Sequence, residues 1–177
     1  MVVTLIGYRG SGKSSIAAPL AERLGWSWID ADVEIERRAG QVIREIFEEH
    51  GEPHFRKLER EVLGELLRRN RMVIAAGGGA VLDRGTRQAL KSAGPVVWLQ
   101  ADSQMLAKRI AADATTAERR PNLTSQGGAA EIQQLLAERE PLYRECATVA
   151  IDTRNQSVDE VVSAVFAAIE PLVLKGI

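Results

Sequence analysis

A glycine-rich loop near the start of the chain holds the first residues whose spacing could do chemistry. Residues 7–14 read G-Y-R-G-S-G-K-S, which matches the spacing G-x-x-x-x-G-K-[ST] of a phosphate-binding loop. Glycines let backbone N–H groups wrap around a phosphate chain, and the helix that should follow adds the positive end of its dipole. Lys13 would reach the β- and γ-phosphates of a nucleotide, and the Ser14 hydroxyl would ligate Mg²⁺. A plain turn with a solvated lysine fits less well, because an apolar run precedes the motif and a helical pattern follows it.

Two acids and three glycines follow later apolar runs and could serve the acceptor of a phosphoryl group. Asp30 and Asp32 come after the run 26–29. Because ligands of open parallel sheets bind at the carboxyl ends of the strands, Asp30 would face metal and phosphates, and Asp32 an acceptor. Alternatively, Asp32 caps a helix and Asp30 is an ordinary turn acid. The glycines at 77–79 follow the run 72–76, and they permit either close approach of a ligand or a tight turn.

Arginines outside the loop could neutralise the charge that phosphoryl transfer develops. Arg56 has Glu59 one helical turn later, close enough to orient its guanidinium. Arg120 lies in a polar stretch, and Arg139 lies in a helical segment with Tyr143 one turn further on. Taken singly, each arginine could be a solvated surface charge. Their combination with the loop and the acids is what indicates a kinase.

The elements that would position these residues alternate between strand and helix. Short apolar runs predict five strands, at 2–6, 26–29, 72–76, 96–99 and 148–151. Segments of helical period lie between the runs and after the last one. This alternation is typical of α/β proteins with a parallel sheet and right-handed crossovers.

Two stretches depart from the simple alternation. Residues 33–70 give three helix-like pieces, broken at Gly40 and at 51–53, which is more than one crossover needs. Residues 112–128 are small, polar and proline-punctuated. We therefore expect one domain over 1–177, with a substrate-binding insertion at about 32–62 and a mobile lid at about 111–127.

Composition limits the classes of partner. The chain has 177 residues, of which 45% are hydrophobic, and a formal net charge of −1, values that fit one globular domain. Near-neutral charge argues against nucleic acid or an anionic membrane as partner, and no apolar run approaches the roughly 20 residues that span a bilayer. The single cysteine, Cys146, excludes an intrachain disulfide framework and a cysteine-based zinc site. With no charged-then-apolar leader, the chain is predicted to be cytoplasmic, and we expect a monomer.

Together the motifs resemble the shikimate kinase family, which belongs to the nucleoside-monophosphate-kinase-like P-loop enzymes. The resemblance runs over essentially the whole chain, with G-Y-R-G-S-G-K-S at 7–14, D-A-D at 30–32, F-R-K-L-E at 55–59, G-G-G-A-V at 77–81, R-R-P at 119–121 and E-R-E-P-L-Y at 138–143. It implies a three-layer α/β/α fold with a five-stranded parallel sheet.

The resemblance also implies an activity and a set of site residues. The activity is ATP-dependent phosphorylation of the 3-hydroxyl of shikimate, on the pathway to chorismate and the aromatic amino acids. Shikimate would be bound by Asp32, Arg56, Gly78 and Arg139. The nucleotide would be bound by Gly10, Ser11, Gly12, Lys13, Ser14, Ser15, Arg109, Arg120 and Arg154, with Arg109 against the adenine. Ser14 would ligate Mg²⁺, with Asp30 acting through water, and the expected catalytic residues are Lys13, Asp32 and Arg120.

Other hypotheses stay open at this stage. A planar guanidinium binds a carboxylate bidentately, so Arg56 and Arg139 suit a small hydroxy acid such as shikimate. A related kinase that uses gluconate, or a nucleotide kinase, is the nearest alternative. A catalytically silent ATP-binding module is the alternative from another class, and it should lack one of the acceptor-side groups.

Overall fold

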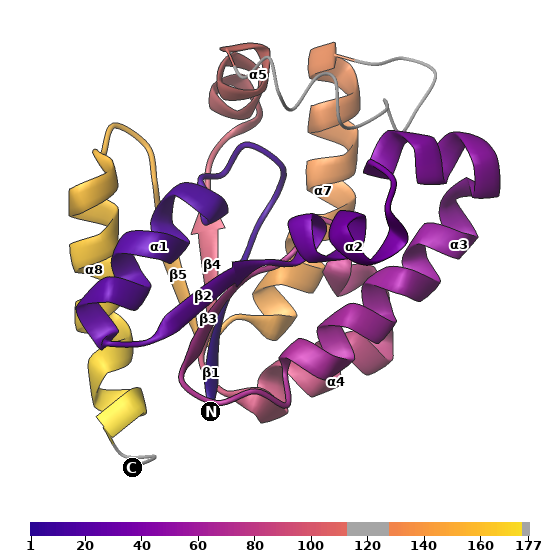
Figure 1. Ribbon diagram of the computed structural model, residues 1–177. Coiled ribbons are helices and arrows are strands. Elements are labelled where there is room, and N and C mark those ends of the chain that lie inside the picture. Colours follow the sequence, from indigo (N-terminus) through magenta and orange to yellow (C-terminus); the bar gives the residue numbers. More distant parts are fainter. Residues whose placement is uncertain (113–127, 175–177) are drawn as a thin grey trace.

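The computed structural model describes residues 1–112 and 128–174. In this part of the chain, strands and helices alternate (Figure 1). The strands are β1 (Val2–Ile6), β2 (Ser27–Asp30), β3 (Met72–Ala75), β4 (Val96–Gln100) and β5 (Val149–Asp152). The helices are α1 (Lys13–Leu24), α2 (Ala31–Ala39), α3 (Ile43–Leu66), α4 (Arg84–Ala93), α5 (Ser103–Ala112), α7 (Gly128–Cys146) and α8 (Val158–Leu174), with a short 3-10 helix, η1 (Ala80–Leu82).

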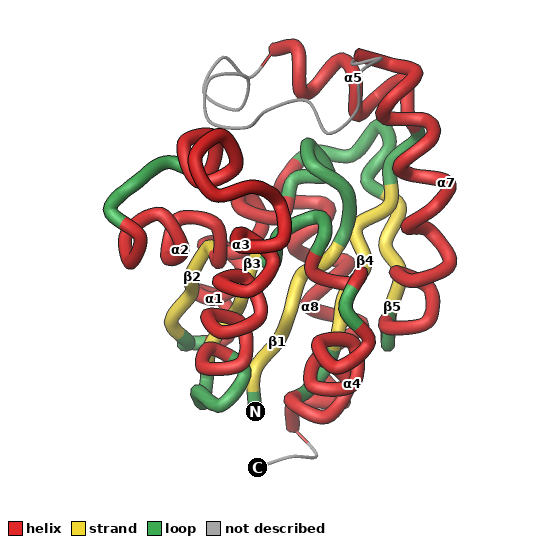
Figure 2. Tube along the Cα trace, turned by 90° about the vertical axis from the view of Figure 1, so that its right-hand side faces the viewer, coloured by secondary structure: helices red, strands yellow, loops and turns green. Residues whose placement is uncertain are grey.

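The five described strands form one parallel sheet in the order β2-β3-β1-β4-β5. β1 is central, with Val3 opposite Val73 of β3 and Leu5 opposite Val97 of β4. Because all strands run the same way, the loops that follow them gather at one end of the sheet. Figure 2 shows these loops with α2 and α3 to one side and α5 and α7 to the other. The predicted five-stranded parallel α/β fold is confirmed.

The sheet is buried on both faces, which explains why its strands read as continuous apolar runs. Val3 and Leu5 of β1 pack with residues of α1 and α8, while Val2 and Ile6 pack on the opposite face with residues of α3, α4 and α7. Figure 1 shows the two helical layers on either side of the sheet. The sheet thus packs between two layers of helices, and these layers support the carboxyl ends of the strands and the loops that follow them.

The segment between β2 and β3 contains the predicted helical pieces. Helix α2 ends at Gly40, whose φ of 68° is left-handed and suits glycine. Helix α3 is kinked at Gly51, with a φ of 78° and ψ of 168°, and Pro53 follows. The breaks at these two glycines are confirmed. The kink divides α3 into a first part near α2 and a second part, carrying Arg56 and Glu59, that leads back to β3.

None of the helices in residues 1–112 and 128–174 combines the length and apolar character that crossing a membrane would need.

Candidate active site

The loop between β1 and α1 has the backbone that its glycines allow. Gly7, Gly10 and Gly12 all have positive φ values, of 141°, 80° and 96°. At Gly7 space is also limiting, because a Cβ there would lie 2.6 Å from the carbonyl oxygen of Leu99. The loop therefore wraps tightly over the end of β1 and opens directly into α1, as a phosphate-binding loop requires.

Lys13, the first residue of α1, folds back over this loop. Its Nζ donates hydrogen bonds to the carbonyl oxygens of Gly7, at 2.8 Å, and Tyr8, at 2.9 Å. The side chain is largely buried, with 9% exposed. The ammonium is thus held within the loop, where the phosphates of a nucleotide would meet it.

Asp30 links the phosphate loop to the start of α2. Its Oδ2 accepts a hydrogen bond from the Ser14 hydroxyl at 2.5 Å, and its Oδ1 accepts from the backbone N–H of Asp32 at 2.9 Å. Asp30 is therefore the N-cap of α2, and the alternative that gave this role to Asp32 is wrong. Asp32 is the second residue of the helix, with 7% of its surface exposed, so its carboxylate does not cap α2.

A cavity of about 560 Å³ opens above the phosphate loop. It brings together most of the residues predicted for the nucleotide and metal. Its lining includes residues 10–15, Asp30, Asp32, Arg109 and Thr153. Within the described residues no three His, Cys, Asp or Glu side chains form a metal-binding group.

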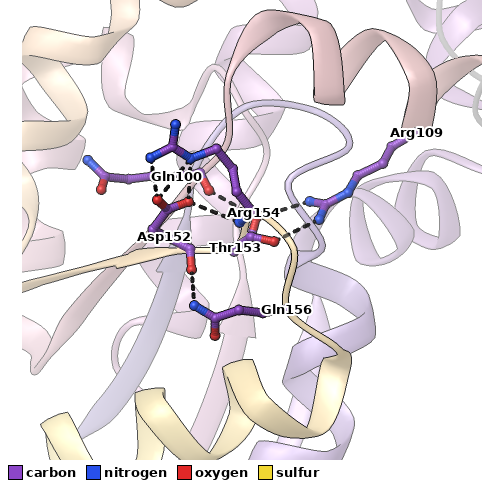
Figure 3. Close-up of polar contacts among 6 residues, drawn as sticks. All are labelled: Gln100, Arg109, Asp152, Thr153, Arg154 and Gln156. Carbon is purple, nitrogen blue, oxygen red and sulfur yellow. Dashed lines mark hydrogen bonds and ion pairs between the residues drawn. The ribbon is translucent and has the colours of Figure 1, made fainter.

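Arg109 on α5 is fixed against the loop that follows β5 (Figure 3). Its guanidinium donates to the Thr153 hydroxyl and carbonyl oxygens, both at 3.0 Å. Thr153 is buried, and its hydroxyl donates in turn to the carbonyl oxygen of Gln100 at the end of β4. One flank of the cavity is therefore built from α5 and the β5–α8 loop, which is bonded to the end of β4.

Arg154 is not brought into this cavity. Its guanidinium forms a bidentate ion pair with Asp152, with Nη2 2.6 Å from Oδ2, and Figure 3 shows the pair next to Gln100. Both side chains line a separate cavity of about 340 Å³, bounded also by Trp98 and Asp102. Hydrogen bonds from Arg154 hold the pKa of Asp152 below its usual value. This cavity shares Ser11 with the cavity above the phosphate loop, so Arg154 lies beside the other residues predicted to bind the nucleotide.

A second, smaller cavity of about 70 Å³ adjoins the first. It brings together the residues predicted for the acceptor, and its lining includes Asp32, Arg56, Glu59, Gly77, Gly78, Gly79 and Arg139. Asp32 and Arg9 line both cavities. Asp32 therefore lies where the two cavities adjoin.

Arg56 is held by two carboxylates of the same helix. Its Nη1 lies 2.8 Å from Oε2 of Glu59, and its Nη2 lies 2.9 Å from Oε1 of Glu52. Burial alone would lower the pKa of Arg56, but the two glutamates raise it. Burial also raises the pKa of Glu59, against the opposing effect of Arg56 and Arg139. The other oxygen of Glu59, Oε1, is buried and has no hydrogen-bond partner among the described residues.

The three glycines after β3 are needed for space. A Cβ on Gly77 would lie 2.6 Å from Oε1 of Glu59 and 2.9 Å from Oδ1 of Asp32. On Gly79 it would lie 2.6 Å from Cζ of Arg56. The backbone also turns here, since the Ala80 N–H donates to the carbonyl oxygen of Gly77 at 3.1 Å, so both expectations for the glycines, a tight turn and close approach, are confirmed. Their missing side chains let two carboxylates and a guanidinium approach the backbone.

Arg139 on α7 faces the same small cavity from the opposite side. It is buried, with 6% exposed, and its guanidinium carbon lies 5.7 Å from the centre of the Tyr8 ring. No ion pair between Arg139 and a carboxylate is found in residues 1–112 and 128–174. The charge of Arg139 thus has an aromatic contact with Tyr8, and it acts on Glu59, whose pKa it lowers.

Some of the site was not predicted from sequence, and one predicted residue is not described. Glu52 pairs with Arg56, Thr153 accepts hydrogen bonds from Arg109, and the Tyr8 ring packs against Arg139. Glu52 stands four residues before Arg56, a helical spacing that could have indicated the pair. Thr153 and Tyr8 carry no such signal. Arg120 and residues 113–127 lie outside the described residues, so the predicted lid has no structural account.

The sequence of this chain is similar to proteins of one family. The shikimate kinase family model matches residues 9–170. A shikimate kinase of Rhodopirellula baltica is 44% identical over 164 residues, covering 93% of this chain and 88% of that protein. One from Nitrobacter winogradskyi is 40% identical over 174 residues, covering 98% and 79%.

Solved structures agree with this result. A shikimate kinase from Acinetobacter baumannii in complex with shikimate has a TM-score of 0.90 at 35% identity, covering 96% of this chain and 93% of that one. A gluconokinase from Sinorhizobium meliloti has a TM-score of 0.64 at 20% identity, covering 98% and 94%, and shares the fold alone. The match in sequence extends from the phosphate loop to α8, through both cavities. This chain belongs to the shikimate kinase family.

Proposed function

We propose that the chain is an ATP-dependent shikimate kinase, which transfers the γ-phosphoryl group of ATP to the 3-hydroxyl of shikimate. The products are ADP and shikimate 3-phosphate. The observation that carries the proposal is the position of Asp32, which lines both the cavity above the phosphate loop and the small cavity of the arginines. A nucleotide in the first cavity and a hydroxy acid in the second would meet at this carboxylate.

On the nucleotide side, the chain supplies donors and positive charge. The backbone of residues 10–15 would surround the phosphates, and the Lys13 ammonium would neutralise charge on the β- and γ-phosphates. Arg109 would lie against the adenine, held in place by Thr153. Arg154 is paired with Asp152 at a neighbouring cavity that shares Ser11 with the first, and its contact with ATP stays a prediction.

Mg²⁺ fits the oxygens present at the phosphate loop. Ser14 Oγ and Asp30 Oδ2 lie 2.5 Å apart beside residues 10–13, and hard oxygen donors of this kind suit Mg²⁺. We propose that Ser14 ligates the ion directly and Asp30 through water. When bound, the ion would neutralise charge on the β- and γ-phosphates.

On the acceptor side, the two arginines would bind the carboxylate of shikimate. Their guanidinium groups come from α3 and α7 and line one small cavity, so both can reach a single carboxylate. The backbone at Gly78 would contact the substrate where no side chain intervenes. Asp32 would accept a hydrogen bond from the 3-hydroxyl and take its proton as the hydroxyl oxygen bonds to the γ-phosphorus of ATP and ADP leaves. In a loose transition state of this kind, positioning of the reactants is the larger part of catalysis.

The segment 111–127 is proposed to be a lid that carries Arg120 to the transferred phosphoryl group. The support for this proposal is the sequence motif R-R-P at 119–121. Closure of such a lid would exclude water, which competes with the 3-hydroxyl for the phosphoryl group. Cytoplasmic location, a monomeric state and the absence of nucleic-acid or membrane partners stay predictions.

A coupled ADP-release assay tests the proposed function. With Mg²⁺ and ATP, shikimate should support turnover, while gluconate and nucleoside monophosphates should not. Lys13→Met should abolish turnover, whereas Lys91→Met, an exposed lysine on α4, should keep it. Good turnover of another acceptor without shikimate activity would favour a related kinase. ATP binding without turnover of any acceptor would favour a silent module.

A further inference from the structure

Tyr143 on α7 is a buried phenol that contacts the acceptor site only through its neighbours. Its side chain is fully buried and lines none of the cavities described above. Its hydroxyl donates a hydrogen bond of 2.5 Å to the carbonyl oxygen of Gly78, which lies 65 residues earlier in the chain. The ring packs against Trp98 of β4, with 5.9 Å between ring centres. One side chain thus connects α7 to the loop after β3.

Arg139 lies one helical turn earlier on the same helix, and its charge acts on this hydroxyl. Burial raises the pKa of Tyr143, and the charge of Arg139 opposes this rise. The phenol therefore stays protonated and can donate to the Gly78 carbonyl. Through this bond it ties the helix that carries Arg139 to the Gly78 backbone, and both are proposed to bind the substrate.

The hydrogen bond from Tyr143 orients the whole peptide group between Gly78 and Gly79. A peptide group is planar, so the bond from Tyr143 also sets the direction of the N–H of Gly79, which points the opposite way. Gly78 is confined from the other side too, because its added Cβ would lie 3.3 Å from the backbone nitrogen of Arg9 in the phosphate loop. The peptide is thereby held between α7 and the phosphate loop.

We infer that Tyr143 is a positioning residue, whose hydroxyl sets the spacing between the Gly78 backbone and the Arg139 guanidinium in the acceptor site. This inference rests on the proposed function, since it assumes that both groups contact shikimate. A hydroxyl that merely satisfied a buried carbonyl would affect stability alone. A positioning hydroxyl must also affect how the acceptor binds.

Tyr143→Phe removes the hydroxyl and keeps the ring. We expect the shikimate KM to rise about tenfold, the scale of one lost hydrogen bond to a buried group, while the ATP KM changes less than about twofold. The matched control is Thr148→Val. Thr148 Oγ1 accepts a hydrogen bond of 3.2 Å from the Val96 backbone at the opposite end of the sheet. This control should lower the melting temperature and leave both KM values unchanged.

The kinetics decide between the two roles. A Tyr143→Phe enzyme with a lowered melting temperature but an unchanged shikimate KM would overturn the inference, as would equal rises in both KM values. The double variant Tyr143→Phe/Arg139→Gln gives a second test, in which its shikimate KM is compared with those of the two single variants. Because Tyr143 acts partly through Arg139, the combined rise in shikimate KM should be smaller than the product of the single rises, and a full product would contradict the inference. Lack of shikimate turnover by the unmodified chain would instead refute the proposed function, and this inference with it.

Discussion

An added methyl group at Gly79 should disable the acceptor site while leaving the fold intact. A Cβ at this position would lie 2.6 Å from Cζ and 2.7 Å from Nη2 of Arg56, where ordinary contact begins at 3.4 Å. The guanidinium must therefore move by about 1 Å. The clash involves the far end of a flexible side chain, so the backbone can keep its course.

The size of the effect follows from what Arg56 would lose. The displaced guanidinium gives up its 2.8 Å contact with Glu59 and its alignment with the substrate carboxylate. A misplacement of about 1 Å can cost on the order of 100-fold in a positioned reaction. For Gly79→Ala we expect the shikimate KM to rise roughly 10- to 100-fold, or about 1.4–2.7 kcal/mol, with little change in the ATP KM.

Steady-state kinetics and thermal unfolding check this expectation, with Gly64→Ala as the control. Gly64 lies on the same helix as Arg56, and a Cβ there would meet nothing within 4 Å. Its replacement in a helix interior should stabilise the fold by roughly 0.5–1 kcal/mol and leave the KM for shikimate unchanged. A Gly79→Ala enzyme whose shikimate KM equals that of the unmodified chain would refute the spatial role assigned to the glycine.

Three further predictions concern charged groups. Arg56→Ala should weaken shikimate binding and also destabilise the fold by about 3 kcal/mol, because it leaves Glu59 buried without its partner. Arg139→Ala should weaken shikimate binding with a smaller loss of stability. Calorimetric titration and chemical denaturation measure both effects, and equal destabilisation would contradict this reasoning. Hydrogen bonds from two arginines lower the pKa of Glu34 to about 2. Glu34→Gln should therefore reduce stability by roughly 0.5–1 kcal/mol at pH 7, and the difference should vanish as pH falls from 4.5 to about 2. Arg120→Ala should lower kcat more than it raises the shikimate KM, and an equal loss in a shikimate titration would argue against its proposed role at the phosphoryl group.

The parts of the site that follow from local rules could be predicted from sequence. The phosphate loop depends on glycines with positive φ at fixed spacing, and the carboxyl-end position of Asp30 and Asp32 follows from strand direction alone. Which of the two acids caps α2 depends on the residue where the helix begins, and a shift of two residues exchanges their roles. Sequence patterns rarely define a helix start that closely.

The remaining parts depend on contacts between distant segments. The need for glycine at 77 and 79 comes from Asp32, Arg56 and Glu59, which arrive from α2 and α3. The Tyr143 bond to Gly78 joins residues 65 positions apart. Arg154 illustrates the converse, because a local ion pair with Asp152 holds its side chain at a neighbouring cavity. Neither long-range packing nor such a rotamer choice leaves a pattern in the sequence.

The central claim is that the junction at Asp32 directs the γ-phosphoryl group of ATP to one hydroxyl of shikimate. Phosphorus and proton NMR of the reaction mixture tests it directly, because phosphorus–proton coupling identifies the carbon that bears the phosphate. We expect a single organic product with the phosphate on the 3-hydroxyl, formed in step with ADP. Phosphate on another hydroxyl, or ADP accompanied only by inorganic phosphate, would contradict it.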